Sequence, residues 1–389
     1  MMRRTITLAC AALGLLLAGC ASAPPPPPPD TALFRDDAFA PPTVRIDADD
    51  IFALSDKMKA FLASSGAHML RESDPRRQLV DALYKRQQLA LDYDSSTTRT
   101  ASEAYASRTG NCLSLVIMTA AFAKALGLPV YYQQVFVDEA WSRSGNNLYV
   151  ASGHVNLALE SLPLMARSVR NIDPPLVVDF LPADELRGQR SRVIDESTVV
   201  AMFMNNRAAE AMADGRLDDA YWWVRAAMEQ APRFLVAYNT LGVIYLRHGL
   251  STDATRVFSQ VLQREPDNPK VMGNLVQALR LEGRGPEADT LAQRLAQLEP
   301  YPPFYWFNAG LQAMREHDYE RARDMFNKEL RREAYYHEFH FWLAQAELGL
   351  GNVRQARLQL QLAMQVSTTG HDHDLYAAKL DRLKALRTQ

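Results

Sequence analysis

Three residues in the first half of the chain have the side chains of a thiol-based catalytic site, namely Cys112, His154 and Asp179. In such a site a thiolate attacks a carbonyl carbon, an imidazole accepts and returns the proton, and a carboxylate orients the ring and offsets its charge. Cys10 and Cys20 fall in a leader segment, so Cys112 is the single thiol in the body of the protein. In an oxidising compartment, such a thiol is either buried or used for its reactivity.

The pattern around the cysteine predicts a helix that begins at the thiol. Residues 113–126 form an apolar run that ends at Gly127, which places Asn111 and Cys112 at or near the first turn. Backbone N–H groups at a helix start have no partner within the helix. They stabilise a thiolate, and they are also available to an oxyanion formed by attack on a carbonyl.

The histidine and the aspartate lie in predicted strands. Residues 130–137, 149–159 and 176–180 have the composition and alternation of strands. His154 alternates with the apolar residues of its strand, and Asp179 lies among apolar residues, where an unpaired carboxylate would be costly. We expect these two side chains to face each other on neighbouring strands. Taken singly, each of the three residues also fits a structural role, as a small buried thiol, a satisfied core histidine or a turn aspartate.

The order of these elements resembles the transglutaminase-like superfamily, whose fold is of the papain-like cysteine type. The motifs that carry the resemblance are Thr-Ala-Ser-Glu-Ala at 100–104, Arg-Thr-Gly-Asn-Cys at 108–112, Ala-Leu-Gly-Leu-Pro-Val at 125–130, Gly-His at 153–154 and Val-Asp at 178–179. The resemblance covers about 70–190 and implies an α+β domain whose catalytic residues are Cys112, His154 and Asp179. Many relatives have an acidic residue where Asn111 stands and an aromatic one where Val155 stands, and these departures bear on substrate choice.

One further side chain could donate a hydrogen bond to an oxyanion. Gln133 or Gln134 lies on the strand that follows the helix, although either could equally be an ordinary strand residue. The calcium-site features of animal transglutaminases are not recognisable in this sequence. We therefore expect neither a metal nor a cofactor.

The second half of the chain is repetitive. Five alanines recur at intervals of thirty-four residues, at Ala220, Ala254, Ala288, Ala322 and Ala356. The clearest unit resembles the tetratricopeptide repeat, through Tyr238, Leu241, Gly242, Tyr245, Ala254, Phe258 and Pro266. We expect about five helix hairpins stacked into an all-α solenoid, closed by a polar-faced helix over residues 375–386.

Such an array presents a concave groove to a partner. Asn239, Gln277 and Arg280 are candidates for lining it, and the alternative is that they belong to solvated helix faces. The sequence predicts a protein partner here without naming it.

The leader predicts export and lipidation. Arg3 and Arg4 precede an apolar run that ends in Leu-Ala-Gly-Cys at 17–20. This segment resembles the lipobox of bacterial lipoproteins, in which Cys20 is acylated, and the absence of aspartate after it resembles sorting to the outer membrane, facing the periplasm. Prolines at 24–29 then form a stiff spacer.

These observations divide the 389 residues into four parts. We expect a signal peptide at 1–19, a lipidated proline-rich linker at 20–45, a transglutaminase-like domain at 46–197 and the repeats with their capping helix at 198–389. The 43 basic and 45 acidic residues nearly cancel, so nothing favours a nucleic-acid partner.

The predicted function is thiol chemistry on a peptide or isopeptide amide, by hydrolysis or by acyl transfer through a thioester. The repeats would recruit the substrate or another protein partner. The enzyme would then be a cysteine peptidase or amidase, or a transglutaminase-like acyltransferase. The alternative is a noncatalytic envelope scaffold that combines a degenerate front domain with protein-binding repeats.

Overall fold

The computed structural model describes residues 28–71, 74–84, 92–94, 97–144, 148–160, 174–180, 189–367 and 369–385. The predicted signal peptide and the lipidation site Cys20 lie outside these residues. Within them, no helix has both the length and the apolar content needed to cross a membrane.

The front of the described chain contains four α-helices, preceded by 3-10 turns at Thr31–Leu33 and Asp36–Ala38. The helices are α2 (Asp56–Met69), α3 (Pro75–Tyr84), α4 (Ala101–Ser107) and α5 (Cys112–Ala125). A helix over about 47–63 would follow from the apolar pattern, but α2 begins later. The reason is local, because the Ser55 hydroxyl caps it by accepting a hydrogen bond from the Met58 N–H.

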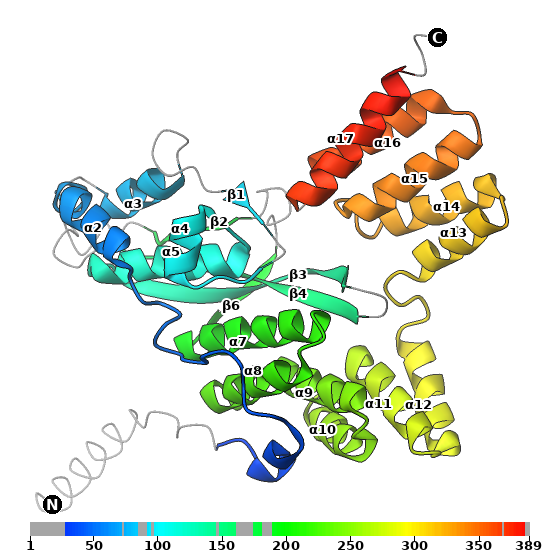
Figure 1. Cartoon of the computed structure of the whole chain (residues 1–389), viewed down its shortest axis with the longest axis horizontal. Coiled ribbons are helices and arrows are strands. Elements are labelled where there is room, and N and C mark those ends of the chain that lie inside the picture. The colour runs from blue at the N-terminus through cyan, green and yellow to red at the C-terminus, as the bar shows by residue number, and fades with distance from the viewer. Residues whose placement is uncertain are drawn as a thin grey trace, which may run out of the picture.

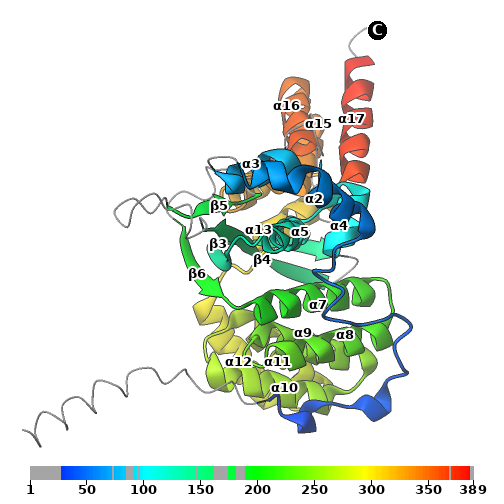
Figure 2. The same ribbon diagram turned by 90° about the vertical axis from the view of Figure 1, so that its left-hand side faces the viewer.

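The front domain has a four-stranded antiparallel sheet of order β5-β4-β3-β6. Its strands are β3 (Val130–Ser144), β4 (Leu148–Leu159), β5 (Leu176–Val178) and β6 (Arg190–Ile194). A short parallel pair, β1 (Asp92–Tyr93) with β2 (Thr109–Gly110), lies just before α5. Figures 1 and 2 show α2 to α5 above the sheet and the helix α7 below it.

From residue 196 onward, the described structure is entirely helical. The hairpin helices are α7 (Glu196–Ala213), α8 (Leu217–Gln230), α9 (Leu235–His248), α10 (Ser251–Arg264), α11 (Pro269–Leu281), α12 (Gly285–Leu298), α13 (Tyr305–Arg315), α14 (Tyr319–Leu330), α15 (His337–Gly349) and α16 (Val353–Gln365). A last helix, α17 (Gly370–Ala385), packs against α16. The five predicted hairpins are therefore present.

Glycine explains the close packing within two of these hairpins. A Cβ at Gly242 would lie 2.4 Å from the ring of Phe258, and a Cβ at Gly310 would lie 2.5 Å from the ring of Phe326. Both rings are fully buried. Each phenylalanine thus fills the space that the facing glycine leaves free, which lets the two helices of the hairpin approach.

The hydrophobic core is interrupted between α12 and α13. One continuous cluster runs from Leu33 in the front domain to Ala288 in α12, and a separate cluster begins at Phe304. The connecting residues 299–304 include three prolines, and Phe304 itself has a left-handed φ of 64°. Figure 1 shows α13 to α17 as a distinct body beyond this connection.

A segment near the N-terminus is fastened across the first two hairpins. Phe39 stacks on Tyr221 at 4.1 Å, and the Arg35 guanidinium pairs with Asp253 at 2.6 Å. The Thr43 N–H and hydroxyl both donate to Asp219, at 2.7 Å each. In Figure 1 this dark-blue segment begins at the lower left of α10 and rises along the left side of α8 to α2. The front domain is thus tied to the array by its own leading strap, residues 30–43.

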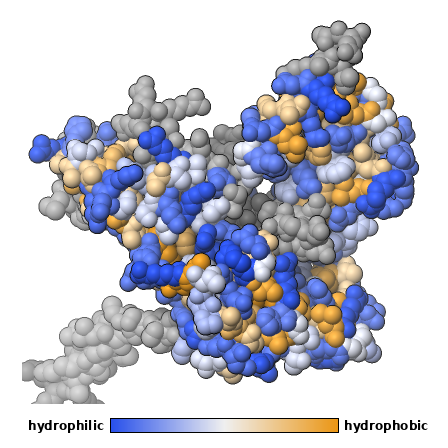
Figure 3. All heavy atoms as spheres, in the orientation of Figure 1, coloured by the Kyte–Doolittle hydropathy of each residue, from blue (hydrophilic) through white to orange (hydrophobic). Residues whose placement is uncertain are grey.

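The surface facing the viewer in Figure 3 mixes hydrophobic and hydrophilic residues over both the front domain and the helical bodies. Single exposed apolar side chains are normal on a soluble surface. The colouring alone therefore singles out no interaction site on this face.

Candidate functional site

Cys112 is the first residue of α5, at the position expected for a thiol used in chemistry. The preceding residue, Asn111, caps the helix by accepting hydrogen bonds from the Ser114 N–H at 2.9 Å and from the Ser114 hydroxyl at 2.8 Å. The thiol is free and partly exposed, whereas the helix that follows is buried from Leu113 to Ala123. A capped helix start thus presents the sulfur beside its first N–H groups.

His154 and Asp179 meet on neighbouring strands. The His154 Nε2 and the Asp179 Oδ1 lie 2.6 Å apart, and both side chains are more than nine-tenths buried. His154 belongs to β4, and Asp179 comes directly after β5, the strand paired with β4. The aspartate therefore has the charge-assisted partner that its burial requires.

The electrostatics of His154 link all three residues. Burial alone lowers its pKa, but hydrogen bonds to Asp179 and to Cys112, together with the charges of both partners, raise it to about 9. Because Nε2 bonds to Asp179, the ring is left with Nδ1 for the thiol. The structure thus brings together Cys112, His154 and Asp179, and the favoured state of the ring at neutral pH is the charged one.

Asn156 is a fourth member of this group that sequence reasoning did not place there. Its side-chain N–H donates to the Asp179 Oδ2 at 2.6 Å, so each oxygen of the carboxylate has a partner. Within the described residues its own Oδ1 is buried without a hydrogen-bond partner. The signal was available, because Asn156 lies two residues from His154 on the same face of the strand.

The strand register separates the two glutamine candidates. Gln133 lies opposite Asn156 and Val135 opposite His154, so Gln133 shares the side of the sheet on which the histidine lies. Gln134 lies opposite Val155, and its Oε1 accepts a hydrogen bond from Arg192 at 2.8 Å. The geometry therefore keeps Gln133 as the better placed of the two.

The three groove candidates have different surroundings. Asn239 on α9 is partly buried, and its Oδ1 accepts a hydrogen bond from Asn274 on α11 at 2.9 Å. Gln277 is exposed on α11. Arg280 is also exposed and lies 3.6 Å from Asp289 on α12. Asn239 thus links two neighbouring hairpins, and Gln277 and Arg280 remain accessible.

A comparison with protein families identifies the helical region. The tetratricopeptide repeat model matches residues 239–303 and 307–370. The C-terminal region consists of tetratricopeptide repeats. This result confirms the prediction made from the thirty-four-residue period, and it points to a scaffold for a protein partner. A comparison with curated proteins finds no match.

Several solved structures are similar to parts of the chain. A tetratricopeptide-repeat protein of Thermus thermophilus is 20% identical, covers 46% of this chain and 98% of its own, and has a TM-score of 0.30. The yeast protein Tom70 is 15% identical over 48% of this chain and 40% of its own, with a TM-score of 0.34. The pilF protein of Pseudomonas aeruginosa is 19% identical over 48% of this chain and 86% of its own, with a TM-score of 0.30.

Proposed function

We propose that this protein is a protein-interaction scaffold whose front domain also carries a thiol site for amide chemistry. The repeat family supports the scaffold. The single observation that carries the thiol site is the arrangement of His154, which is hydrogen-bonded to Asp179 and whose pKa is raised by both Asp179 and Cys112. By this proposal the front domain is papain-like, of the transglutaminase-like type, and the chain is a lipoprotein anchored through Cys20 at the outer membrane, facing the periplasm.

In the first half-reaction, the Cys112 thiolate attacks the carbonyl carbon of an amide. A carbon–sulfur bond forms while the carbonyl electrons move to oxygen, where the N–H groups at the start of α5 stabilise the charge. The carbonyl then re-forms and the carbon–nitrogen bond breaks. The leaving amine takes the proton of the charged His154 ring, which Asp179 holds in place.

In the second half-reaction, water or an amine attacks the thioester. The attacking group gives its proton to His154, the carbon–sulfur bond breaks, and the thiolate is restored. Water gives hydrolysis and an amine gives acyl transfer. We favour hydrolysis, because water is the more abundant acceptor at the periplasmic face.

The second candidate is a noncatalytic scaffold, and the repeats favour it. The family match lies within the repeats and covers none of the thiol domain. In that case the array would bind its protein partner while His154, Asp179 and Cys112 served only to stabilise the front domain. The two candidates differ in the reactivity that they assign to the thiol.

The deciding measurement is the alkylation rate of Cys112 in the intact chain, read at the Cys112 peptide by mass spectrometry. Iodoacetamide reacts with the thiolate, so its rate reports how far His154 stabilises that form. For the thiol site we expect His154→Ala to slow the reaction at pH 6.5 by about tenfold, which corresponds to about 1.4 kcal/mol. His340→Ala is the matched control, because His340 is another buried histidine, on α15, far along the chain.

A second measurement tests the covalent step itself. With p-nitrophenyl acetate as the probe, a thiol site should form an acetyl adduct on Cys112 in the wild type and much less in His154→Ala. Equal alkylation and equal acetylation in the two proteins would leave the noncatalytic scaffold as the function.

A further inference from the structure

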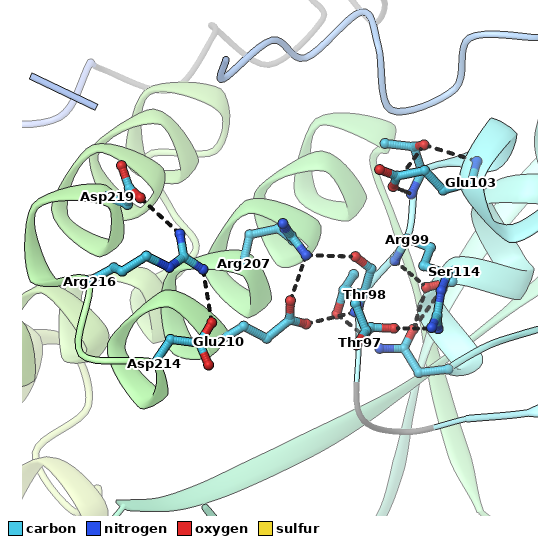
Figure 4. Close-up of polar contacts among 12 residues, drawn as sticks. Thr97, Thr98, Arg99, Glu103, Ser114, Arg207, Glu210, Asp214, Arg216 and Asp219 are labelled. Atoms are coloured by element: carbon cyan, nitrogen blue, oxygen red, sulfur yellow. Dashed lines mark hydrogen bonds and ion pairs between the residues drawn. The ribbon is translucent and has the colours of Figure 1, made fainter. Parts of the chain in front are cut away.

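A chain of polar contacts runs from the first repeat helix to the cap of the thiol helix (Figure 4). On α7, the Glu210 carboxylate accepts a hydrogen bond from the Thr98 N–H at 2.7 Å. The Thr98 hydroxyl in turn accepts one from the Asn111 side-chain N–H at 2.9 Å. Asn111 is the residue that caps α5, directly before Cys112.

The residues in this series of contacts each make further hydrogen bonds. Arg207, one turn before Glu210 on the same helix, donates to the second carboxylate oxygen at 2.8 Å. Arg207 also donates to the Thr98 carbonyl, at 3.4 Å, and Thr98 is 1% exposed. Arg99, the next residue, donates its N–H to the Ser114 hydroxyl at 2.8 Å. The loop 97–100 therefore lies fixed between the repeat array and the thiol helix.

The arrangement gives Asn111 two tasks. Its oxygen caps α5, and its N–H group needs a partner because the side chain is nine-tenths buried. Thr98 supplies that partner, and Glu210 fixes Thr98. If Glu210 were removed, the loop would lose its short bond to α7 and keep only the longer contact between the Thr98 carbonyl and Arg207, so the orientation of the cap next to Cys112 would be less firmly fixed.

We propose that Glu210 is a positioning residue for the thiol site, through which the first repeat helix sets the reactivity of Cys112. The inference rests on the proposed thiol chemistry and adds its regulation. A protein partner that shifts α7 changes the Thr98 and Asn111 contacts, and so changes how Cys112 faces His154. The array and the thiol then act as one unit.

The chain offers a closely matched control for Glu210. Glu282 closes α11 in the third hairpin, and its carboxylate accepts a hydrogen bond from the Thr255 hydroxyl at 2.6 Å. It also pairs with an arginine, Arg284, at 3.1 Å. Glu210 and Glu282 thus each accept a hydrogen bond from a threonine and pair with an arginine, and of the two only Glu210 reaches the thiol domain.

The experiment compares Cys112 alkylation between pH 6 and 9 in the intact wild type and in Glu210→Ala, Glu210→Gln and Glu282→Ala. We expect Glu210→Ala to slow the reaction at pH 6.5 by about tenfold, or about 1.4 kcal/mol, near the strength of one hydrogen bond to a charged group. Glu210→Gln should recover most of the rate, because its amide oxygen still accepts from the Thr98 N–H. Glu282→Ala should react as the wild type does.

The outcomes separate this inference from the function on which it rests. If His154→Ala slows alkylation but Glu210→Ala does not, the thiol site stands and the positioning role of Glu210 is wrong. If His154→Ala has no effect, the proposed function itself fails. Should Glu210→Ala not fold, Thr98→Val removes the hydroxyl with little change of shape, and an unchanged alkylation profile in that variant would also overturn the inference.

Discussion

The first three repeat hairpins and the last two share one sequence period but differ in what they pack against. The helices α7 to α12 continue the core of the front domain, whereas α13 to α17 have separate cores. The first hairpins are also held by the strap and by the Glu210 contacts. A regular repeat in sequence therefore does not guarantee a continuous solenoid. The front domain and α7 to α12 form a first body, which contains the thiol site, and α13 to α17 form a second body.

Equivalent positions at the α10 to α11 junction and the α12 to α13 junction differ in how deeply their side chains are buried. Val261 on α10 is 1% exposed, whereas Leu295, thirty-four residues later on α12, is only partly buried. Met272 on α11 is fully buried, whereas its counterpart Trp306 on α13 is only partly so. Leu298, at the end of α12, is 47% exposed. Both sides of the α12 to α13 junction thus keep apolar surface that the α10 to α11 junction buries.

The largest expected effect comes from emptying the matched ring sites. Phe258→Ala and Phe326→Ala should each cost about 3–5 kcal/mol, because each removes a fully buried ring from beside a glycine. Since the cores are separate, we expect calorimetry to show two transitions, with Phe258→Ala lowering the one that includes the front domain and Phe326→Ala the other.

Cys112 alkylation during heating assigns the transitions independently. Exposure of the thiol should follow the transition that Phe258→Ala lowers, and Phe326→Ala should leave it in place. A single transition lowered equally by both variants would show that the two bodies unfold together, and the comparison would then be wrong.

The second prediction concerns the pH dependence of the stability of the first body, which contains His154. The pKa of His154 is raised from its ordinary 6.5 to about 9, so the folded protein holds this proton more tightly than the unfolded chain does. The stabilisation is complete below pH 6.5 and is lost as the pH rises through about 9. We expect the melting temperature of the first transition to fall over this window.

The matched variant for this pH effect is Asp179→Asn. It keeps the shape of the side chain but removes the charge that favours the protonated ring, so the decline between pH 6.5 and 9 should become shallower. The second transition serves as an internal reference. A first transition with the same pH slope in both proteins would contradict the assignment of His154 to a charged state.

The third prediction concerns methyl groups introduced where the two helices of a hairpin are in close contact. Gly242→Ala and Gly310→Ala place a Cβ within 2.4 and 2.5 Å of Phe258 and Phe326 respectively. Such overpacking typically costs about 1–3 kcal/mol. Thermal unfolding should again assign each variant to its own transition. A melting curve that neither variant changes would contradict the close packing between each glycine and its phenylalanine ring.

Much of this architecture could be predicted from local pattern. The alanine period gave the hairpins, and the apolar run after Cys112 gave α5, because both signals lie within one element. Alternation also placed His154 on a strand, and it placed Asp179 within the next one, although β5 ends one residue earlier, at Val178; the two side chains meet at 2.6 Å. The two strands follow one another along the chain and pair directly, so the pattern of each strand and the order of the elements sufficed to predict the contact.

The remaining contacts depend on how distant segments meet. Thr98 and Glu210 are separated by more than a hundred residues, and neither has an unusual sequence context. The strap contact of Arg35 with Asp253 spans an even longer stretch of chain. The interruption of the core between α12 and α13 could not be predicted for another reason. Ala288 and Ala322 keep the thirty-four-residue period across it, so the repeat looks regular in the sequence. Periodicity reports the fold of a unit, and only tertiary packing shows whether neighbouring units touch.

The smallest expected effect tests whether charge, rather than apolar burial, distinguishes the two bodies. Arg294 on α12 pairs with Asp267 at 2.7 Å, and both side chains are more than half exposed. Exposed pairs contribute little because water screens them, so Arg294→Gln should change the free energy of unfolding by less than about 1 kcal/mol. Chemical denaturation at low and high salt provides the measurement. A loss as large as that of Gly242→Ala would mean that surface charge holds the end of the first body, and the difference between the junctions could no longer be assigned to buried apolar contacts.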